Sequence, residues 1–555
     1  MSHDADVVII GAGPVGLTLG NLLGADGVRV VLLEAGAELV DYPRAVGIDD
    51  EALRTMQTIG LVDEVLPHTV PNQKIFMVNG DRAILSEVDP RISEFGWPRR
   101  NGFVQPLVDR VLLAGLGRFP NVDVRFGAEV TDSTDDGSAV TVSYRTADGA
   151  THQVTATYLV GADGGSSPTR KRLGLTFEGE TRATKGLVID VNNDPIGTPH
   201  AVFGGDPKRG YATIRLPHGI RRWEFTLFEG EDEALVEDDA FVFGLLRSHV
   251  PDPEALDIIR RRVYTHHARV AGAFRVGRTL LAGDAAHVMP VVGGQGWNSG
   301  IRDALNLGWK LSAVVRGLAG DGLLDTYESE RFGHVSQMVA ISLNMAEEMT
   351  SHDEEFARER DRLAAARTAE EREQVRNQAF KPQPHYLDGA VVTAPSPTYK
   401  TLPAREVPST AGTLFPQPRV RTTDACEVLL DHATGQGWRV IMWDNDPTAF
   451  LGDEVVAQLA RLGGSLVRVV PTTQLPWDRV HTAESVVVVG DDGALKDWFD
   501  ARPVGAVIVR PDHIIAAECL AQDLEATLRQ VFAVAHVAQP AEERGEAVSA
   551  GAVAS

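Results

Sequence analysis

The sequence predicts an α/β protein: a Rossmann-like domain that is interrupted by an inserted β-sheet and followed by a second α/β domain. Three observations carry this prediction. A buried strand at residues 6–10 runs into the glycine-rich turn GAGPVG, and two later strands, near residues 158–164 and 279–284, also end in turns that contain an acidic residue. Apolar strands then alternate with amphipathic helices again after about residue 400.

The composition is that of a globular chain. Hydrophobic residues make up 43% of the 555 residues, and no apolar run reaches the roughly 18 residues that cross a bilayer, so we expect no membrane partner. The net charge of −24 leaves no basic face for nucleic acid. Cys426 and Cys519 lie far apart and form no metal-binding motif, and the N-terminus lacks a signal-peptide pattern. We therefore expect a cytoplasmic protein without a metal site.

The first glycine turn has the features of a dinucleotide-binding motif. Gly11, Gly13 and Gly16 lie between the strand and a helix, and the next strand ends at Glu34. The glycines allow a tight turn, close approach of the backbone to a pyrophosphate and close helix–strand packing, while Glu34 is placed to accept ribose hydroxyls. This motif does not distinguish FAD from NAD.

The second turn, YLVGADG, ends in Asp163 and Gly164 and is an ordinary turn when taken alone. The third is more specific: a strand delivers Asp284, a glycine-rich loop follows, and a long helix begins near Asn298. An acid at a strand end suits a ribityl hydroxyl. A helix N-terminus suits the electron-rich N1–C2=O edge of a reduced flavin, so the third turn indicates FAD.

Together these motifs resemble the single-component flavoprotein aromatic hydroxylases, the p-hydroxybenzoate hydroxylase superfamily. Within it, the segments DYPRAVGIDDEALRTMQ, FGWPRRNGFVQPLVD, RRVYTHHARVAGAFRVGR and VIVRPD are similar to the hydroxylases of 3-(3-hydroxyphenyl)propionate and 3-hydroxycinnamate. The resemblance implies FAD, reduction by NADH without a separate nicotinamide domain, and insertion of one oxygen atom from O2 into a small aromatic substrate. Hydroxylation of another phenol, such as a polyketide, stays open, as does a flavin-dependent dehydrogenase or a non-oxygenating flavin protein.

The resemblance also implies a set of FAD contacts. It places Arg44 and Gln105 near the pyrophosphate and ribityl chain, and Asp284 at the ribityl hydroxyls. Asp163 and Gly164 belong to a motif associated with both FAD and the nicotinamide. The residues expected at the ring edge are Gly294, Gly296 and Asn298. Val291 stands where the commonest pattern of the superfamily has a second proline, and we expect this change to reshape the pocket loop.

The predicted domain organisation follows from these assignments. The FAD-binding domain is expected to be discontinuous (1–75, 100–180 and 270–345), with a β-rich substrate domain between its pieces (76–99 and 181–269). A helical arm and proline-rich linker (346–400) leads to a thioredoxin-like α/β domain (401–539) without CxxC, for which we expect a structural role or a homodimer contact. The tail 540–555 is expected to be disordered.

Hydroxylation of a phenol requires a proton acceptor near its hydroxyl and a dry pocket. The resemblance favours Asp49 as that acceptor; Asp50 competes with it, and Asp50 is alternatively the N-cap of the helix EALRTM. Tyr264 and His266 alternate on a strand and are further catalytic candidates, although a packed core histidine is the commoner case. Arg221 or Arg222 is a candidate for the substrate carboxylate, against the alternative of surface arginines.

Overall fold

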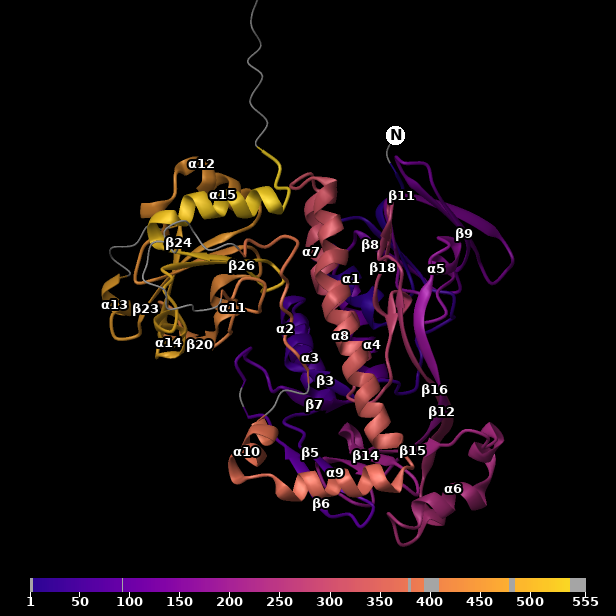
Figure 1. The fold of residues 1–555 in the computed structure, drawn as a ribbon. Coiled ribbons are helices and arrows are strands. Elements are labelled where there is room, and N and C mark those ends of the chain that lie inside the picture. The colour runs from indigo at the N-terminus through magenta and orange to yellow at the C-terminus, as the bar shows by residue number, and fades with distance from the viewer. Residues whose placement is uncertain (1–2, 92, 378–380, 394–408, 479–484, 540–555) are drawn as a thin grey trace, which may run out of the picture.

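The computed structural model describes residues 3–91, 93–377, 381–393, 409–478 and 485–539. The expected disordered tail, 540–555, lies outside these residues, as do 378–380 and 394–408, which contain part of the expected linker and the start of the expected C-terminal domain. The described part confirms the predicted α/β class and contains three large sheets and one small one (Figure 1).

The first sheet is the Rossmann-like one. Its order is β17 (Arg275–Val276), β18 (Thr279–Leu281), β11 (Thr151–Gly161), β1 (Ala5–Ile10), β2 (Val30–Leu33) and β8 (Val122–Arg125), and the last five of these are parallel. An antiparallel extension adds β10 (Val140–Arg145) and β9 (Glu129–Asp135). The helices of this part are α1 (Pro14–Ala25), α2 (Asp50–Thr58), α3 (Val62–Val65), α4 (Gln105–Leu116), α5 (Pro168–Arg172), α7 (Gln295–Val315) and α8 (Asp325–Thr350).

The main core lies between this sheet and helices α1, α4 and α7. Apolar residues of β1 alternate between the two faces of the sheet, and both faces are buried, which explains the continuous run VVII. A three-stranded sheet of β3 (Gly47–Asp49), β7 (Arg100–Phe103) and β4 (Thr69–Val70) lies beside it.

The inserted sheet has eight strands. Its order is β19 (His287–Val288), β16 (Ile258–Ala271), β12 (Phe177–Val191), β15 (Arg221–Leu227), β14 (Tyr211–Arg215), β13 (Ala201–Gly205), β5 (Ile75–Asn79) and β6 (Ile84–Val88). Its neighbouring helices are α6 (Asp239–Leu246), α9 (Glu354–Ala366) and α10 (Ala369–Asn377), which lie at the lower end of the molecule in Figure 1.

Three predicted domain boundaries fall inside continuous elements, and the domain division stays a prediction. The boundary at 180/181 lies within β12, the one at 269/270 lies within β16, and the one at 345/346 lies within α8. The cause is that β12 and β16 pair along most of their length, so one ribbon passes from the Rossmann-like part into the inserted sheet. Motif spacing does not reveal such hydrogen bonding.

The C-terminal part is a separate mixed α/β sheet. Its order is β21 (Glu427–Leu429), β20 (Arg419–Arg421), β24 (Val486–Asp491), β23 (Ser465–Pro471), β22 (Arg439–Trp443), β25 (Ala506–Val509) and β26 (Ile515–Cys519). Its helices are α11 (Leu430–Thr434), α12 (Asp453–Arg461), α13 (Leu475–Asp478), α14 (Ala494–Asp500) and α15 (Leu524–Val534).

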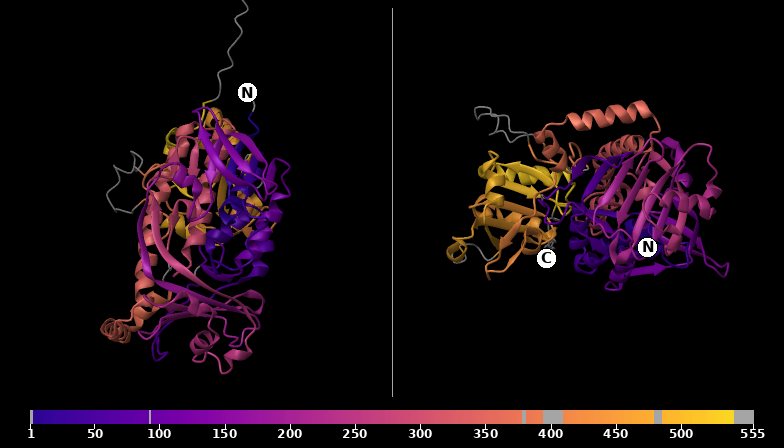
Figure 2. Two further views of the ribbon diagram at one scale, coloured as in Figure 1. Left: turned by 90° about the vertical axis from the view of Figure 1, so that its right-hand side faces the viewer. Right: turned by 90° about the horizontal axis from the view of Figure 1, so that it is seen from below.

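Buried ion pairs join the C-terminal part to α2 and α8, a buried hydrogen bond from Asn306 to Asp512 joins it to α7, and we call this contact the seam. Figures 1 and 2 show the C-terminal part, in orange and yellow, beside these helices. At one place Asp431 accepts hydrogen bonds from Arg54 and Arg439, and at another Glu330 pairs with Lys310 at 2.8 Å and with Arg510 at 2.7 Å.

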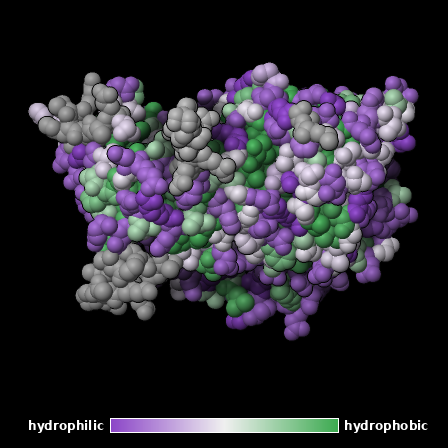
Figure 3. Space-filling model, turned by 90° about the horizontal axis from the view of Figure 1, so that it is seen from above, coloured by the Kyte–Doolittle hydropathy of each residue, from purple (hydrophilic) through white to green (hydrophobic). Residues whose placement is uncertain are grey.

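The surface seen from above mixes hydrophilic residues with small hydrophobic areas (Figure 3). Among the residues that the structure describes, no helix is both long enough and apolar enough to cross a bilayer.

Candidate functional site

The three acidic or glycine-rich turns and Glu34 lie along one edge of the Rossmann-like sheet. Hydrogen bonding aligns the last residues of four neighbouring parallel strands: Leu281 of β18, Gly161 of β11, Ile10 of β1 and Leu33 of β2. The next residues are the turns that carry Asp284, Asp163, Gly11 and Glu34. The carboxyl edge of a parallel sheet is the usual ligand site of such folds, and here it holds all four motif positions.

The turns also touch one another. Gly11 has φ +109°, and a Cβ there would overlap the carbonyl oxygen of Ala162, so only glycine fits between the first two turns. Val15 of α1 lies in a recess of the third turn, because a Cβ on Gly283 or on Gly300 would come within 2.7 or 2.6 Å of its side chain. The three motifs therefore form one continuous surface.

The start of α1 is open toward this surface. A Cβ on Gly13 would meet no atom within 4 Å, and no side chain caps the helix. The first-turn N–H groups of α1 and its positive dipole end thus face open space, which suits the pyrophosphate of FAD. Glu34, at the next strand, accepts hydrogen bonds from the backbone N–H groups of Ala12 at 2.8 Å and Gly36 at 2.7 Å, which holds the turn in shape.

The other predicted cofactor residues lie around the same edge. Asp163 accepts hydrogen bonds from Ser167 Oγ at 2.5 Å and from the N–H of Thr169 at 2.9 Å, so its carboxylate shapes the turn that contains Gly164. Arg44 lies 3.5 Å from Asp284, and both side chains are well exposed. Gln105 accepts a hydrogen bond from the N–H of Ala45 at 2.8 Å. Their contacts with FAD stay predictions.

The N-terminus of α7 is fixed against β3. Gly294 is the N-cap with φ +68°, and Asn298 donates to the carbonyl oxygens of Gly47 at 3.0 Å and Gly294 at 2.8 Å and accepts from the N–H of Asp49 at 3.1 Å. A Cβ on Gly296 would meet only Met289, at 3.8 Å. The free N–H groups of this long helix therefore have room for an electron-rich ring edge.

A cavity of about 680 Å³ lies between these turns and the inserted sheet. Its lining from the cofactor side includes Arg44, Asp284, Met289, Val291 and Gly296. From the sheet it includes Val188, Arg222, Glu224, Arg260, Arg262 and Tyr264. The volume is in the range of small-molecule and cofactor sites.

Tyr264 and Glu224 form a hydrogen-bonded pair in the cavity wall. The Tyr264 hydroxyl donates to Glu224 Oε2 at 3.0 Å, and the ring lies across Gly186, where a Cβ would overlap it. Burial raises the pKa of Tyr264 well above its ordinary value, and the carboxylate of Glu224 adds to the shift. Burial also raises the pKa of Glu224, against the opposing effect of Arg222. The pair thus presents a protonated phenol beside a carboxyl group that holds its proton more tightly than usual.

His266 has a different environment. Its side chain is buried, and its ring packs edge-on against Tyr264 with the centroids 5.0 Å apart. Burial lowers its pKa to about 4, so the imidazole is neutral at pH 7. His266 is not among the cavity-lining residues, and this geometry fits the packed-histidine alternative; a catalytic role stays a prediction.

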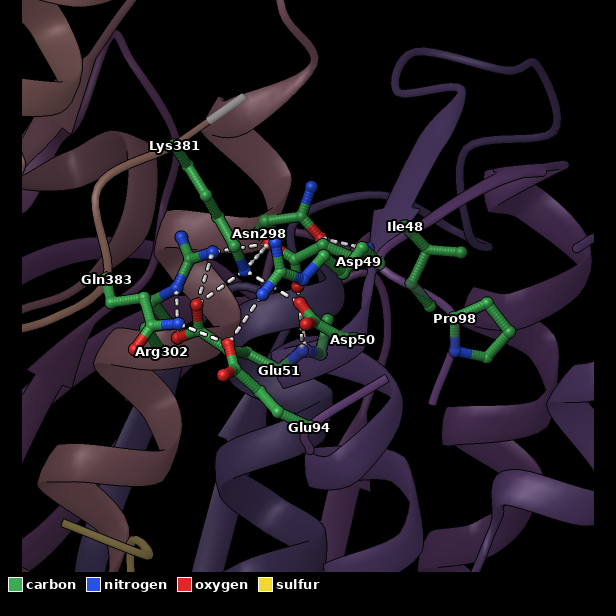
Figure 4. A network of polar contacts seen from close by, with 12 residues as sticks. Ile48, Asp49, Asp50, Glu51, Glu94, Pro98, Asn298, Arg302, Lys381 and Gln383 are labelled. Carbon is green, nitrogen blue, oxygen red and sulfur yellow. Dashed lines mark hydrogen bonds and ion pairs between the residues drawn. The ribbon is translucent and has the colours of Figure 1, made fainter. Parts of the chain in front are cut away.

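Asp49 belongs to a buried ion cluster at the N-terminus of α2 (Figure 4). Its carboxylate accepts a hydrogen bond from the N–H of Ala52 at 2.9 Å and pairs with Arg302 and with Lys381, the latter at 2.6 Å. Asp49, rather than Asp50, is therefore the N-cap, because the helix begins one residue earlier than predicted. The carboxylate is engaged on both oxygens, and its role as a proton acceptor stays a prediction.

Asp50 and Glu51 complete this cluster. Lys381 contacts Asp50 at 3.0 Å and Glu51 at 2.5 Å, and Arg302 contacts Glu51 at 2.7 Å. Burial raises the pKa of Asp50 to about 6 although Lys381 opposes the shift. The ammonium of Lys381 thus contacts all three acids, and the guanidinium of Arg302 contacts two of them.

The two arginines considered for the substrate carboxylate are not surface residues, which corrects that alternative. Arg221 is 0% and Arg222 1% exposed. Arg221 pairs with Asp194 at 2.5 Å, and Arg222 pairs with Asp190 at 2.7 Å and donates to the carbonyl oxygens of Pro43 and Arg44.

The sequence did not single out Glu224, Asp190, Arg260 or Arg262, although all lie on the cavity side of the sheet. The available signal was periodicity: Arg260, Arg262 and Tyr264 alternate along one strand and so share a face. It gave no indication of which face lies toward the cavity.

Comparison with known proteins agrees with this geometry. The family model "FAD binding domain" matches residues 4–342, and the model "HcaD C-terminal domain" matches residues 412–534. A protein of Mycobacterium sp. strain JLS named 3-(3-hydroxy-phenyl)propionate/3-hydroxycinnamic acid hydroxylase is 50% identical over 97% of this chain and 93% of its own length. A protein of the same name from Paraburkholderia xenovorans is 44% identical over 94% of this chain and 89% of its own length.

Solved structures show the same architecture. The flavin-dependent monooxygenase PieE, in complex with FAD and substrate, aligns with a TM-score of 0.79 at 22% identity, covering 97% of this chain and 100% of PieE. Aklavinone-11 hydroxylase, with FAD and aklavinone, aligns with a TM-score of 0.75 at 25% identity, covering 96% of this chain and 99% of the hydroxylase.

The family of this chain follows from the family match together with the site, in which an open helix N-terminus at Gly13 adjoins the glycine turns. The chain belongs to the FAD-binding-domain family, as an FAD-dependent aromatic monooxygenase with a C-terminal domain of the HcaD type.

Proposed function

We propose that this enzyme hydroxylates 3-(3-hydroxyphenyl)propionate and 3-hydroxycinnamate ortho to the phenol hydroxyl, with NADH as electron donor and O2 as oxygen source, in the catabolism of phenylpropanoids. The observation that carries the proposal is the 44–50% identity to hydroxylases named for these two compounds, over nearly the full chain.

The residues of the site support this chemistry. FAD, when bound, supplies reduction and oxygen transfer, and the residues proposed to hold it are the turns around Gly11, Gly13, Gly16, Glu34, Asp163 and Asp284, with the start of α7. The inserted sheet contributes the wall that contains Tyr264 and Glu224.

Tyr264 is proposed to contact the substrate phenol. A phenol becomes a stronger nucleophile at its ortho carbon as its proton is withdrawn, so a hydrogen-bonded acceptor in a water-poor cavity accelerates attack. Tyr264 can receive a hydrogen bond from the substrate while it donates to Glu224, which is the geometry of a proton path from the phenol to a carboxylate. Asp49 lies in a cluster where cations already neutralise it, so Tyr264 is the better supported of the predicted catalytic residues.

The test is to measure NADH oxidation, O2 uptake and product mass together for the purified FAD-loaded enzyme. We expect 3-(3-hydroxyphenyl)propionate and 3-hydroxycinnamate to gain one oxygen atom, labelled when ¹⁸O₂ is supplied. NADH oxidation without labelled product would overturn the proposal in favour of a dehydrogenase. Coupled turnover of polycyclic phenols alone would overturn the substrate assignment. A homodimer and a cytoplasmic location stay predictions.

A further inference from the structure

Three strands of the inserted sheet present one face to the cavity, and their register places charged residues in rows. Pairing of β15 with β12 and of β12 with β16 defines three rows: Arg222–Asp190–Arg260, Glu224–Val188–Arg262 and Thr226–Gly186–Tyr264. Because side chains two residues apart on a strand share a face, Arg260, Arg262 and Tyr264 point to the same side.

The three arginines on this face differ in how they are neutralised. Arg222 and Arg260 share the buried carboxylate of Asp190, at 2.7 and 3.3 Å, and both donate to the carbonyl oxygen of Pro43. Arg262 forms no ion pair or hydrogen bond with any residue in the described part of the chain. Its guanidinium lies 5.2 Å from the centre of the Tyr42 ring.

Arg262 is also accessible from the cavity. Its side chain is exposed while it lines the same space as Tyr264 and Glu224. Arg222, in contrast, has all three guanidinium nitrogens engaged with Asp190, Pro43 and Arg44. Arg260 has one nitrogen engaged with Asp190 and Pro43, so Arg262 has the most donors left for a ligand among the three. An arginine with five free donors suits bidentate binding of a carboxylate.

The spacing between Arg262 and Tyr264 limits the distance between the two polar groups of a ligand that contacts both residues. Two residues along a strand span about 6.8 Å, given the rise of roughly 3.4 Å per residue. A phenol with a two-carbon acid arm in the meta position separates its hydroxyl and carboxylate by a similar span, one ring and a short chain. The hydroxyl can therefore meet Tyr264 while the carboxylate meets Arg262.

We propose that Arg262 is the specificity residue that binds the side-chain carboxylate of the substrate, with the phenol hydroxyl placed at Tyr264. This inference rests on the proposed function and deepens it: it states which end of the substrate each residue recognises. It also states that apolar contacts alone do not select the substrate, because an uncharged analogue would lose the interaction with Arg262.

The experiment compares an acid with its amide. The dissociation constants of 3-(3-hydroxyphenyl)propionate and of 3-(3-hydroxyphenyl)propionamide are measured by the change in flavin absorbance of the FAD-loaded enzyme, for wild type, Arg262→Gln and Arg262→Lys. For Arg262→Gln we expect the constant of the acid to rise by about ten-fold or more, the usual size of a charge-assisted contact, and that of the amide to change less than about three-fold. Arg262→Lys is expected to recover part of the loss.

Arg261→Gln is the matched control. Arg261 is the neighbour of Arg262 on β16, pairs with Asp239 at 2.5 Å and is not among the residues that line the cavity, so we expect its removal to leave the dissociation constant of the acid unchanged.

The outcomes separate this inference from the proposed function. If wild type hydroxylates the acid and Arg262→Gln binds it equally well, or loses acid and amide alike, the inference is wrong while the function stands. If Arg262→Gln raises only the KM for NADH, Arg262 serves the nicotinamide instead and the inference is again wrong. If wild type neither binds nor hydroxylates the acid, both fail together.

Discussion

The seam and the cavity face both contain buried carboxylates and arginines, but the charges are fully paired in the seam and only partly paired on the cavity face. In the seam, two buried carboxylates each meet two cations: Asp431 meets Arg54 and Arg439, and Glu330 meets Lys310 and Arg510. On the cavity face, Glu224 has a tyrosine and a more distant arginine at 3.6 Å, and Arg262 has no carboxylate among the described residues.

The carboxyl groups of the two regions have pKa values that are shifted in opposite directions. Burial opposes ionisation in both regions, but Arg54 and Arg439 hold the pKa of Asp431 far below its usual range, and Arg510 and Lys310 lower that of Glu330 to about 2. The pKa of Glu224 is raised, because burial outweighs Arg222. Removing one partner from a fully paired cluster leaves a buried charge without compensation, whereas partly paired charges remain available to a ligand and to a proton.

The largest expected effect is in the seam. Asp431→Asn leaves Arg54 and Arg439 buried without their carboxylate, and removing one partner of a buried pair typically costs about 3–5 kcal/mol. We expect a loss of this size in the free energy of unfolding, measured by urea denaturation. The matched control is Glu454→Gln, which breaks the exposed pair with Arg529 and should cost far less. Equal losses would remove the distinction between the seam and an ordinary surface pair.

The next effect is on the cavity face. Gly186→Ala introduces a Cβ where the Tyr264 ring lies, so the ring must shift and its hydrogen bond to Glu224 is lost. We expect about 1–3 kcal/mol of destabilisation, as for other overpacked sites, together with a lower kcat for hydroxylation.

Gly204→Ala is the control for Gly186→Ala. It creates the same kind of overlap with the ring of Tyr211, which does not line the cavity. The expected pattern is a similar loss of stability in both variants and a loss of kcat only in Gly186→Ala. A kcat loss shared by both would show that sheet distortion, not the Tyr264 position, limits the rate.

The smallest change in stability is expected for Glu224→Gln, which keeps the acceptor for Tyr264 but removes the ionisable group. Because the folded pKa of Glu224 is raised above 4.5, its contribution to stability is complete below that pH and declines as pH rises through the folded pKa. Glu224→Gln should therefore gain stability relative to wild type between pH 5 and pH 8, measured by thermal unfolding.

We also expect the hydroxylation rate of wild type to rise as Glu224 ionises and Glu224→Gln to lack this rise, measured as a kcat–pH profile. The contribution of Glu330 to stability depends on pH in the opposite direction, because its folded pKa is lowered. This contribution is complete above pH 4.5 and is lost as pH falls toward about 2. An unchanged kcat–pH profile in Glu224→Gln would place the proton acceptor elsewhere in the site.

The sequence allowed the fold class, the FAD turns and their shared edge to be predicted, because each turn has a local pattern whose chemistry is recognisable. Gly11, for example, is required by its positive φ and by the backbone next to it. Glu224 and Arg262 had no such pattern. Their importance comes from their places on β15 and β16, which flank β12 in the sheet although the two residues lie far apart in the chain, and from which of them pairs with a carboxylate. Lys381 was missed for the same reason, since it reaches the α2 cluster from a proline-rich linker.

The continuity of β16 has a consequence for how this enzyme can change its substrate. One end of the strand pairs with β19, just after the Asp284 turn, and the other carries Arg262 and Tyr264. Inserting or deleting a single residue between them would turn the recognition side chains to the opposite face. New substrate ranges can therefore arise in this lineage by exchanging side chains at alternate positions, while the strand length stays constrained by the cofactor loop at its far end.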